Sequence, residues 1–332
     1  MRKVARFSDK DREELFLATA GKIGIRPEAI EKDFWICYML DHLFHECVYK
    51  DAFVFKGGTS LSKSYHLINR FSEDIDLVLD WRRIITDDSN PWDSRSNNKQ
   101  DQYNKSLNTK AALFYASELV PALNSELRDI LGPDCSVSID GQDEMVINFP
   151  YPRLFKDDYI RPVIRLEIGP LAEWTPSHIT TVSPFVAEEY QGLFKQPSTE
   201  VLTVDAERTF WEKITILHKI ANIPEEKTLP KRYARHLYDV YCMGHSYVKE
   251  RAFERKSLLE RDVIFKKKFY YSKGAGYETA TLDSVTLIPN DRILSELRKD
   301  YKAMENMIYG EIPPFDDIIE YLSSLQEEIH AL

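Results

Sequence analysis

The sequence predicts an α+β fold, in which a small mixed sheet flanked by helices is followed by a helical C-terminal part. Short strand patterns are confined to roughly the first 205 residues, whereas helical spacing of apolar residues dominates after them. The chain has 332 residues, of which 43% are hydrophobic, which suits one large domain or two moderate ones. We therefore expect one domain over residues 1–205 and a helical domain over 206–332.

Two helices are expected before the first strand. Ser8 can cap a helix that starts at Asp9 and ends at Gly21 or Gly24, because a serine oxygen accepts hydrogen bonds from the first turn. Pro27 fits the first turn of a second helix over 27–44, since proline has no N–H to leave unpaired there. The apolar residues of this second helix recur near helical spacing, which predicts an amphipathic helix.

The next elements alternate between strand and helix. Phe53, Val54 and Phe55 predict a short buried strand before a pair of glycines. Helical apolar spacing over 59–69 predicts a helix there. Apolar and polar residues then alternate over 74–81, which is typical of a strand.

The rest of the first domain is expected to hold a polar segment, a helix and short strands. Residues 83–104 are polar and aperiodic, which indicates a loop or insertion, and a long helix is expected over 104–131. Strands are expected within 136–139, 144–149, 163–169, 178–186 and 201–204. Helices are expected at 205–222, 231–244, 250–269, 290–309 and 315–331.

Composition narrows the class of protein. The net charge of −10 argues against a protein that coats nucleic acid along its whole surface. No apolar run approaches the roughly 20 residues that span a bilayer, and the N-terminal residues turn polar too soon for a signal peptide, so we expect no membrane association and a cytoplasmic location. Four scattered cysteines, Cys37, Cys47, Cys135 and Cys242, support neither a zinc site nor a disulfide framework.

Asp74 and Asp76 are the first candidates for chemistry. Residues two apart on a strand project to the same face, so the two carboxylates could share one or two Mg²⁺ ions. Such ions can activate an attacking oxygen and stabilise a leaving pyrophosphate. The pattern alone is weak evidence, because Asp9 and Asp11 repeat it at a polar helix start.

A glycine turn precedes this pair. Gly57 and Gly58 let the backbone approach a ligand closely, and the following helix start, with Thr59 and Ser60, offers N–H groups and hydroxyls to a phosphate. The alternative is an ordinary strand-to-helix turn capped by threonine or serine. A strand, two glycines, a helix and a strand that carries two aspartates follow in this order, which favours a site that binds a triphosphate and its metal ions.

The same run carries a family resemblance. FKGGTSLSKSYHLINRFSEDIDLVLD (55–80) resembles the first motif of the nucleotidyltransferase superfamily, and more narrowly that of the AbiEii/AbiGii toxins, the enzymatic half of bacterial abortive-infection and toxin–antitoxin pairs. RLEIG (165–169), ERTFWEKITILH (207–218) and RYARHLYDVY (232–241) follow in the same order, and EKDFWICYML (31–40) is also similar. The likeness extends over about two-thirds of the chain and leaves out 83–104 and roughly the last 80 residues.

The resemblance implies roles for three further residues. Glu167 would be the third metal-binding carboxylate, with a salt bridge to Arg165 as the alternative. Lys213 would neutralise the triphosphate, unless it is a surface charge beside Glu212. Asp239 would accept a proton from the attacking hydroxyl or orient Lys213, unless it pairs with Arg235 one helical turn away. The helical domain would thus contribute Lys213 and Asp239 to the cleft.

Other polar residues lie inside or beside these motifs. Arg232 and Arg235 could face the nucleotide or an RNA acceptor. Lys56 and Lys63 border the glycine turn, where either could touch phosphate, although surface positions are favoured for both. His218 and His236 are expected to serve in packing or capping.

The resemblance implies a magnesium-dependent nucleotidyltransferase toxin, with Mn²⁺ as a substitute. An NTP would be the donor, and an RNA such as tRNA, or a protein side chain, the acceptor. Its partner would be a separately encoded antitoxin, expected to be a DNA-binding regulator. Two alternatives stay open: a metal-dependent phosphodiesterase or nuclease, and a non-catalytic NTP-binding module on the same scaffold.

Overall fold

The computed structural model describes residues 1–132, 136–156, 160–224, 226–272 and 274–332. Cys135 lies outside these ranges. The chain divides into two compact units. The first comprises residues 1–64 and 72–204, and the second comprises 65–71 and 205–332.

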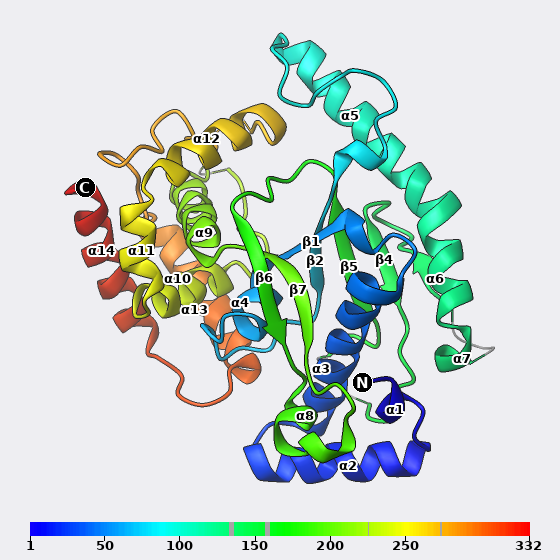
Figure 1. Cartoon of the computed structure of the whole chain (residues 1–332). Helices are drawn as coiled ribbons and strands as arrows, with labels where there is room; N and C mark the ends of the chain where they lie inside the picture. Colours follow the sequence, from blue (N-terminus) through cyan, green and yellow to red (C-terminus); the bar gives the residue numbers. More distant parts are fainter. Residues whose placement is uncertain (133–135, 157–159, 225, 273) are drawn as a thin grey trace. The chain divides into compact units, whose positions relative to one another are not determined.

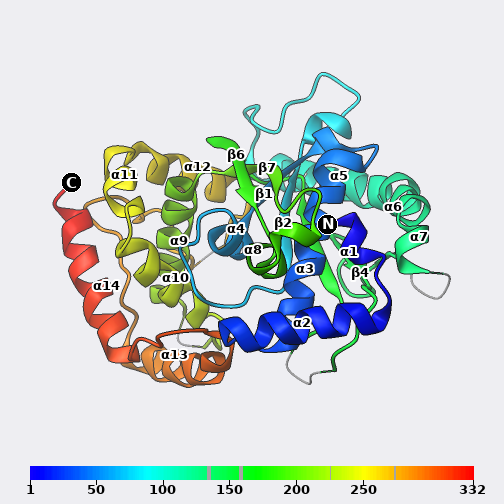
Figure 2. The ribbon, with the colours of Figure 1, turned by 60° about the horizontal axis from the view of Figure 1, so that its bottom comes forward.

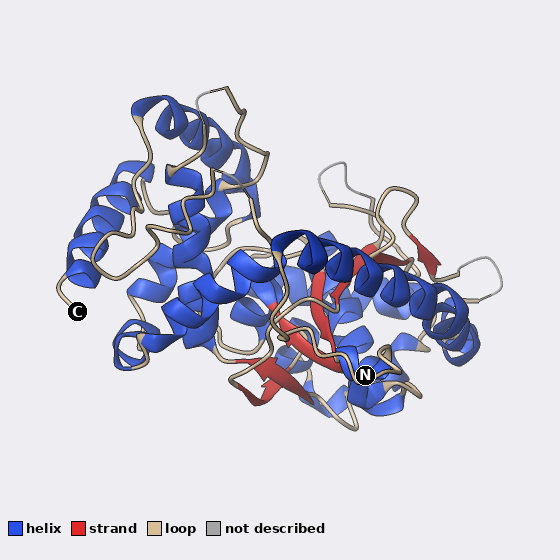
Figure 3. Cartoon of the chain, turned by 90° about the horizontal axis from the view of Figure 1, so that it is seen from above, coloured by secondary structure: helices blue, strands red, loops and turns tan. Residues whose placement is uncertain are grey.

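The first unit is built around a seven-stranded mixed sheet with the order β3-β4-β5-β2-β1-β7-β6 (Figure 1). Its strands are β1 (Phe53–Lys56), β2 (Ile75–Leu79), β3 (Ser138–Ile139), β4 (Val146–Phe149), β5 (Ile164–Gly169), β6 (Ser177–Val182) and β7 (Thr199–Val204). A strand is present in each segment where alternation or β-branched residues predicted one, and the predicted fold class, a mixed sheet flanked by helices, is confirmed (Figure 3).

The register of the central strands fixes the positions of polar residues at one end of the sheet. β1 is antiparallel to β2, with Lys56 opposite Asp76. β2 is parallel to β5, with Asp76 beside Glu167. The hydrophobic partners of these strands, Ile75 and Leu77 on β2 among them, are buried. The sheet therefore presents a lysine, an aspartate and a glutamate on three adjacent strands.

The N-terminal helices of this unit follow the capping signals in the sequence. Helix α1 spans Arg2–Ala5, α2 spans Asp9–Ile23 and α3 spans Pro27–Asp41. The Ser8 hydroxyl accepts a hydrogen bond from the Asp11 N–H at the start of α2, and Gly24 ends that helix in the left-handed conformation with φ of 71°. A π-helical turn (His42–Glu46) and a 3-10 turn (Lys50–Ala52) lead from α3 to β1.

Helix α3 differs from the amphipathic helix that the sequence predicts. It contacts β5 and β7, α2 and the short helix α8 (Phe185–Glu189), and Figures 1 and 2 show it among these elements. Every residue from 29 to 40 is buried, because neighbours cover all sides of the helix. Three consecutive charged residues, Glu31, Lys32 and Asp33, are therefore out of contact with water.

The helix expected at 59–69 is shorter and starts earlier than predicted. Helix α4 spans Gly57–Lys63, and the chain then leaves the first unit. Residues 65–71 form their backbone hydrogen bonds within the second unit, where Phe71 N–H donates to Met307 O and Tyr309 N–H donates to Asn69 O. These bonds replace the helical ones, so apolar spacing alone misled the prediction.

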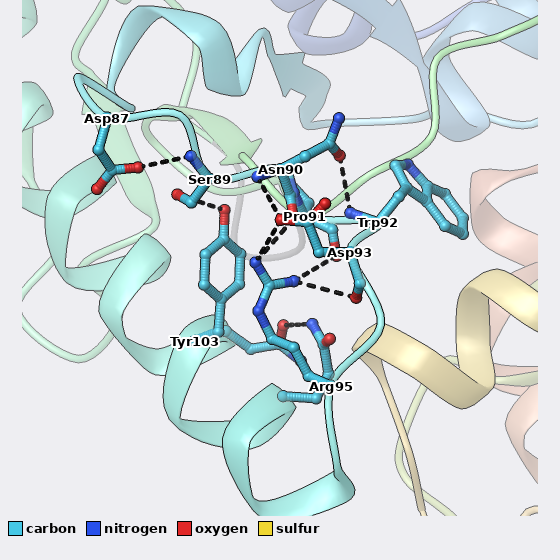
Figure 4. A network of polar contacts seen from close by, with 10 residues as sticks. Asp87, Ser89, Asn90, Pro91, Trp92, Asp93, Arg95 and Tyr103 are labelled. Carbon is cyan, nitrogen blue, oxygen red and sulfur yellow. Dashed lines mark hydrogen bonds and ion pairs between the residues drawn. The ribbon is translucent and has the colours of Figure 1, made fainter.

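The segment 83–104 is not the featureless loop that its composition predicts. A 3-10 turn forms at Trp81–Arg83, and helix α5 already begins at Asn97. Between them, the Arg95 guanidinium donates to the carbonyls of Asn90 (2.9 Å) and Pro91 (3.2 Å) and lies 3.9 Å from the ring centroid of Tyr103 (Figure 4). Arg95 thus links several residues of a loop that has no periodicity of its own, and side-chain acceptors of the loop, such as Asp93, also bind its backbone N–H groups.

The long helix predicted over 104–131 is interrupted. It consists of α5 (Asn97–Phe114), a π-helical turn (Tyr115–Leu119), α6 (Val120–Glu126) and α7 (Arg128–Leu131). Pro121 lacks the N–H that a regular helix would use, and the π turn directly precedes it. In that turn, the Tyr115 hydroxyl donates to Ile168 O and ties the helix to β5.

The second unit is helical. Its helices are α9 (Ala206–Ala221), α10 (Ala234–Gly244), α11 (Val248–Glu254), α12 (Ser257–Phe269), α13 (Asp291–Met304) and α14 (Phe315–His330). Helix α10 contacts α9, α13 and α14, which surround it in Figure 2. The helix predicted over 250–269 is split between α11 and α12, and 3-10 turns form at Gln191–Leu193 in the first unit and Glu305–Met307 in this one. Within the described ranges, none of the helices has the length and apolar character that crossing a bilayer would need.

Glu31 should make stability depend on pH. Burial raises the pKa of its carboxyl from an ordinary 4.5 to about 7, although the N–H groups of Leu154 and Phe155 favour the ionised form. Between these values the folded protein holds a proton that the unfolded chain has lost. The free energy of unfolding should therefore fall by roughly 3 kcal/mol as pH rises from 4.5 to 7.

Urea unfolding across this pH range tests the expectation. Glu31→Gln keeps an acceptor for one N–H and should abolish the decline, whereas the exposed Glu13→Gln should leave it unchanged. An equal pH slope in wild type and Glu31→Gln would contradict the assignment.

Candidate active site

The glycine turn and the carboxylate strand meet at Gly57 and Asp76. Gly57 adopts φ of 81°, a conformation that favours glycine. A Cβ atom at this position would lie 1.9 Å from Asp76 Oδ2, so the carboxylate occupies the space that any other side chain would fill. The glycine is therefore required by the aspartate, and the two predicted motifs form one local structure.

Asp74 adds a second carboxylate to this structure. Its Oδ1 is buried and has no hydrogen-bond partner among the described residues. The Thr59 hydroxyl donates to the Asp74 backbone carbonyl and links α4 to the start of β2. A buried carboxylate oxygen without a donor is costly unless a cation or donor approaches it, which fits a hard metal ion.

Glu167 lies beside Asp76 in the parallel register of β5 and β2. Its Oε1 is 3.5 Å from Arg165 NH1, which is the salt bridge that the sequence offered as the alternative role. In the part of the chain that the structure describes, no three histidine, cysteine, aspartate or glutamate side chains are grouped closely enough to hold a metal ion. The aspartates fit an ion, whereas Glu167 as a third ligand stays a prediction.

Several of the residues predicted to contact the nucleotide belong to the same turn or to the helix that follows it. Lys56 is half-buried at the end of β1, directly before Gly57 and opposite Asp76, and Gly58 follows in the first turn of α4. Ser60 is buried and donates from its hydroxyl to Gly57 O over 2.8 Å, so it supports the turn rather than presenting its hydroxyl outward. Lys63 is not a surface residue, because its ammonium group is buried 2.7 Å from Asp33.

In the second unit, Lys213 and Asp239 form a buried cluster with Arg70. Lys213 Nζ is 2.7 Å from Asp239 Oδ2, and Arg70 donates from Nε to Oδ1 (2.7 Å) and from NH2 to Oδ2 (2.8 Å). Asp239 is fully buried, and its partners are these two cations instead of Arg235, which is exposed. Lys213 is likewise buried, so the surface-charge alternative is wrong.

Burial and neighbouring charges shift the pKa values of Asp239 and Lys213 in this cluster. Burial alone would raise the pKa of Asp239, but Arg70 and Lys213 lower it well below its ordinary range, so the carboxylate is a poor proton acceptor. One carboxylate faces two cations, and burial lowers the pKa of Lys213 despite that neighbour. The low basicity of Asp239 favours the orienting role, in which its carboxylate holds the Lys213 ammonium.

The histidines of the motifs serve as expected in packing. Burial holds the pKa of His236 well below its usual value, and its neutral ring can accept at Nδ1 from the Lys213 ammonium, 3.2 Å away. His218 accepts at Nδ1 from the Thr286 N–H. Arg232 is half-buried with φ of 65°, and its N–H donates to Asp300 at the entry to α10.

Neither Arg70 nor the neighbouring residues Lys32 and Asp33 were predicted from the sequence. Arg70 lies in a polar connection whose packing depends on residues more than 160 positions away, so no local pattern marks it. Lys32 and Asp33 stand in a segment with helical spacing, where charged residues are ordinarily assigned to the solvent face. A run of charges within an otherwise apolar helix was the available signal.

The motifs of this chain match those of a known protein family. The sequence model of the nucleotidyl transferase AbiEii toxin family, described as a type IV toxin–antitoxin system, matches residues 39–321. Among solved structures, the chain is similar to MenT4, a nucleotidyltransferase toxin from Mycobacterium tuberculosis, with 15% identity, a TM-score of 0.42, and coverage of 95% of this chain and 98% of that chain. No curated protein matches. The family match spans most of the chain and includes every motif residue from Lys56 to Asp239, so this protein belongs to the AbiEii family of nucleotidyl transferase toxins.

Proposed function

We propose that this toxin transfers a nucleotidyl group from an NTP to a hydroxyl of an RNA, with release of pyrophosphate and dependence on Mg²⁺. The observation that carries the proposal is the seating of the Asp76 carboxylate against Gly57, together with the buried Asp74 oxygen two residues earlier that has no hydrogen-bond partner among the described residues. Two carboxylates in the same short segment as a glycine turn provide ligands for a metal ion, and the turn lets a phosphate approach the backbone.

In this proposal, Asp74 and Asp76 hold the Mg²⁺ ion, or Mn²⁺ in its place, and Glu167 becomes a third ligand by leaving Arg165. When bound, the ion supplies charge neutralisation at the phosphates and acidifies the attacking hydroxyl. Gly57 leaves room for the Asp76 carboxylate, Gly58 adds no side chain beyond it, Thr59 and Ser60 stiffen the turn, and Lys56 at its entrance binds phosphate.

Lys213 binds the triphosphate as charge develops on the leaving group, and Asp239 orients it. The support is the 2.7 Å contact between Lys213 Nζ and Asp239 Oδ2, which fixes the position of the lysine. Arg235, which is exposed one helical turn before Asp239, contacts phosphate, and Arg232 also binds the nucleotide. The family match supports these roles because it includes all of these residues.

The family's type IV toxin–antitoxin description implies an antitoxin as partner. We propose a separately encoded DNA-binding regulator in that role, a cytoplasmic site of action, and tRNA as the first RNA to test. A protein side chain is the alternative acceptor.

Asp74→Asn and Asp76→Asn should each lower nucleotidyl transfer at least ~100-fold, because losing a metal ligand costs several kcal/mol of transition-state stabilisation. The assay incubates the protein with each α-labelled NTP, Mg²⁺ and total RNA, and follows label in RNA. Chelation of the metal should abolish transfer, and Mg²⁺ or Mn²⁺ should restore it. Asp11→Asn, in the exposed Asp-x-Asp at the start of α2, is the matched control and should retain full activity.

Other outcomes of this assay point elsewhere. Transfer of label to protein would indicate that the acceptor is a protein side chain and not RNA. Shortening of RNA without NTP, lost in Asp76→Asn, would indicate a phosphodiesterase. Binding of NTP in calorimetry without transfer to RNA or protein would indicate a non-catalytic module.

Gly57→Ala should abolish transfer while the protein still folds. The new methyl group would displace the Asp76 carboxylate, and alanine at φ of 81° costs only about 1 kcal/mol. Gly21→Ala in α2 has no atom within 4 Å of its new methyl group and should retain wild-type activity. Comparable activity of the two variants, at comparable melting temperature, would refute the close contact.

Asp239→Asn should destabilise the protein by about 3 to 5 kcal/mol, because Arg70 and Lys213 lose a buried counter-ion. Lys213→Met leaves the Arg70 pair intact, so it should unfold at higher urea concentration than Asp239→Asn yet raise the KM for NTP. Equal urea midpoints for Asp239→Asn and wild type would contradict the buried cluster.

A further inference from the structure

Helix α3 carries three consecutive charged side chains in its buried centre. Glu31 and Lys32 are 0% exposed and Asp33 is 3% exposed. Lysine, glutamate and aspartate are almost never buried unless each has a partner, since removal of a charge from water is costly. Each of these three side chains contacts a different segment of the first unit.

Lys32 reaches the residue that precedes the metal pair. Its Nζ donates to Glu73 Oε2 over 3.1 Å, and the side chains are 0% and 2% exposed. The same oxygen accepts from the Arg161 N–H at 2.9 Å, and Lys32 also donates to Arg161 O at 3.1 Å. Glu73 is therefore held from two sides, directly before Asp74.

Asp33 reaches the other end of the glycine-turn helix. Its Oδ1 is 2.7 Å from Nζ of Lys63, the last residue of α4, and its Oδ2 accepts from the Phe185 N–H at 2.8 Å. The Lys63 ammonium also lies 4.0 Å from the ring centroid of Phe185. Helix α4 is thus tied to α3 at its end and meets Asp76 at its beginning.

We propose that Lys32 and Asp33 are positioning residues for the reaction: Lys32 holds Asp74 through Glu73, and Asp33 holds the Gly57 turn through Lys63. Neither residue touches substrate in this role. The inference rests on the proposed function, because it assigns a purpose to the two segments that would bind metal and nucleotide. The Thr59 hydroxyl, which donates to Asp74 O, couples the two segments directly.

A structural role alone makes a different prediction. Buried ion pairs often contribute little net stability, and replacing both partners with neutral residues can leave a fold intact. If the pairs only support the fold, neutral double variants that fold should bind metal and nucleotide as the wild type does. If the pairs position the site, metal affinity and nucleotide use should fall in folded protein, and each pair should affect a different ligand.

The test uses two double variants of the full chain. Lys32→Met/Glu73→Gln keeps an acceptor for the Arg161 N–H, and Asp33→Asn/Lys63→Met keeps one for the Phe185 N–H. The affinity for Mn²⁺ is measured without NTP, from the electron paramagnetic resonance spectrum of the free ion. Transfer of label from the NTP gives kcat and the KM for NTP. Glu126→Gln is the control, since Glu126 pairs with His42 and accepts from Val48 in the same unit but contacts neither segment.

We expect Lys32→Met/Glu73→Gln to weaken Mn²⁺ binding about 10- to 100-fold, as loss of an outer-shell partner does at other metal sites, with a smaller change in the KM for NTP. Asp33→Asn/Lys63→Met should instead raise that KM or lower kcat, with a smaller effect on Mn²⁺ affinity than the first double variant has. Glu126→Gln should match wild type in all three measurements. If the first double variant does not fold, Glu73→Asp keeps both charges of the pair but shortens the side chain that links Lys32 to Asp74, and it should weaken Mn²⁺ binding in the same direction.

Wild-type affinities and kinetics in both folded double variants would overturn the positioning role. Failure of the proposed function is separable, because a wild type that binds Mn²⁺ but transfers no label still reports the effect of Lys32 on metal affinity. A wild type that does not bind Mn²⁺ would overturn both, since no metal pair would then exist to be positioned.

Discussion

The register between β1 and β2 is the constraint on which the candidate site depends. Lys56 stands opposite Asp76, so the residue after Lys56 meets the Asp76 carboxylate and has to be glycine. A slip of one residue would turn the aspartate toward the core and an apolar neighbour, Ile75 or Leu77, toward the glycine turn. The hydrophobic burial of Ile75 and Leu77 on β2 therefore selects the register that assembles the polar site, and the register between β2 and β5 brings Glu167 alongside Asp76.

Charge inside the protein is organised by pairing in both units. In the first unit each buried charge of α3 has a partner on a segment distant in sequence, and in the second unit a single carboxylate serves two cations. Such pairs add little to stability compared with apolar packing. They do require defined geometry, because a buried charge tolerates displacement poorly, and this requirement is useful where a site has to be held in place.

Local signals in the sequence were sufficient for much of the fold. Alternation, β-branched residues or a short apolar run predicted each of the seven strands, and the Ser8, Gly24 and Pro27 signals predicted the first helices. The α4 prediction was wrong because residues 65–71 pair with residues near 308, and no local pattern encodes such a partner. For the candidate site, spacing predicted Asp74, Asp76 and Gly57, and the structure brings Asp76 against Gly57. Arg70, Lys32 and Asp33 were missed, because their burial results from tertiary packing alone.

The passage of residues 65–71 into the helical unit has a consequence for synthesis. A ribosome that has completed the sheet has already made Arg70, but the carboxylate that accepts its hydrogen bonds is 169 residues further along the chain. Until Asp239 and Ile308 are made, Arg70 cannot form its ion pair with Asp239 or its strand-like contact with Ile308. The loop between α4 and β2 thus reaches its final structure only when nearly the whole polypeptide exists, so that a truncated translation product of this toxin would lack an ordered segment between its two principal motifs.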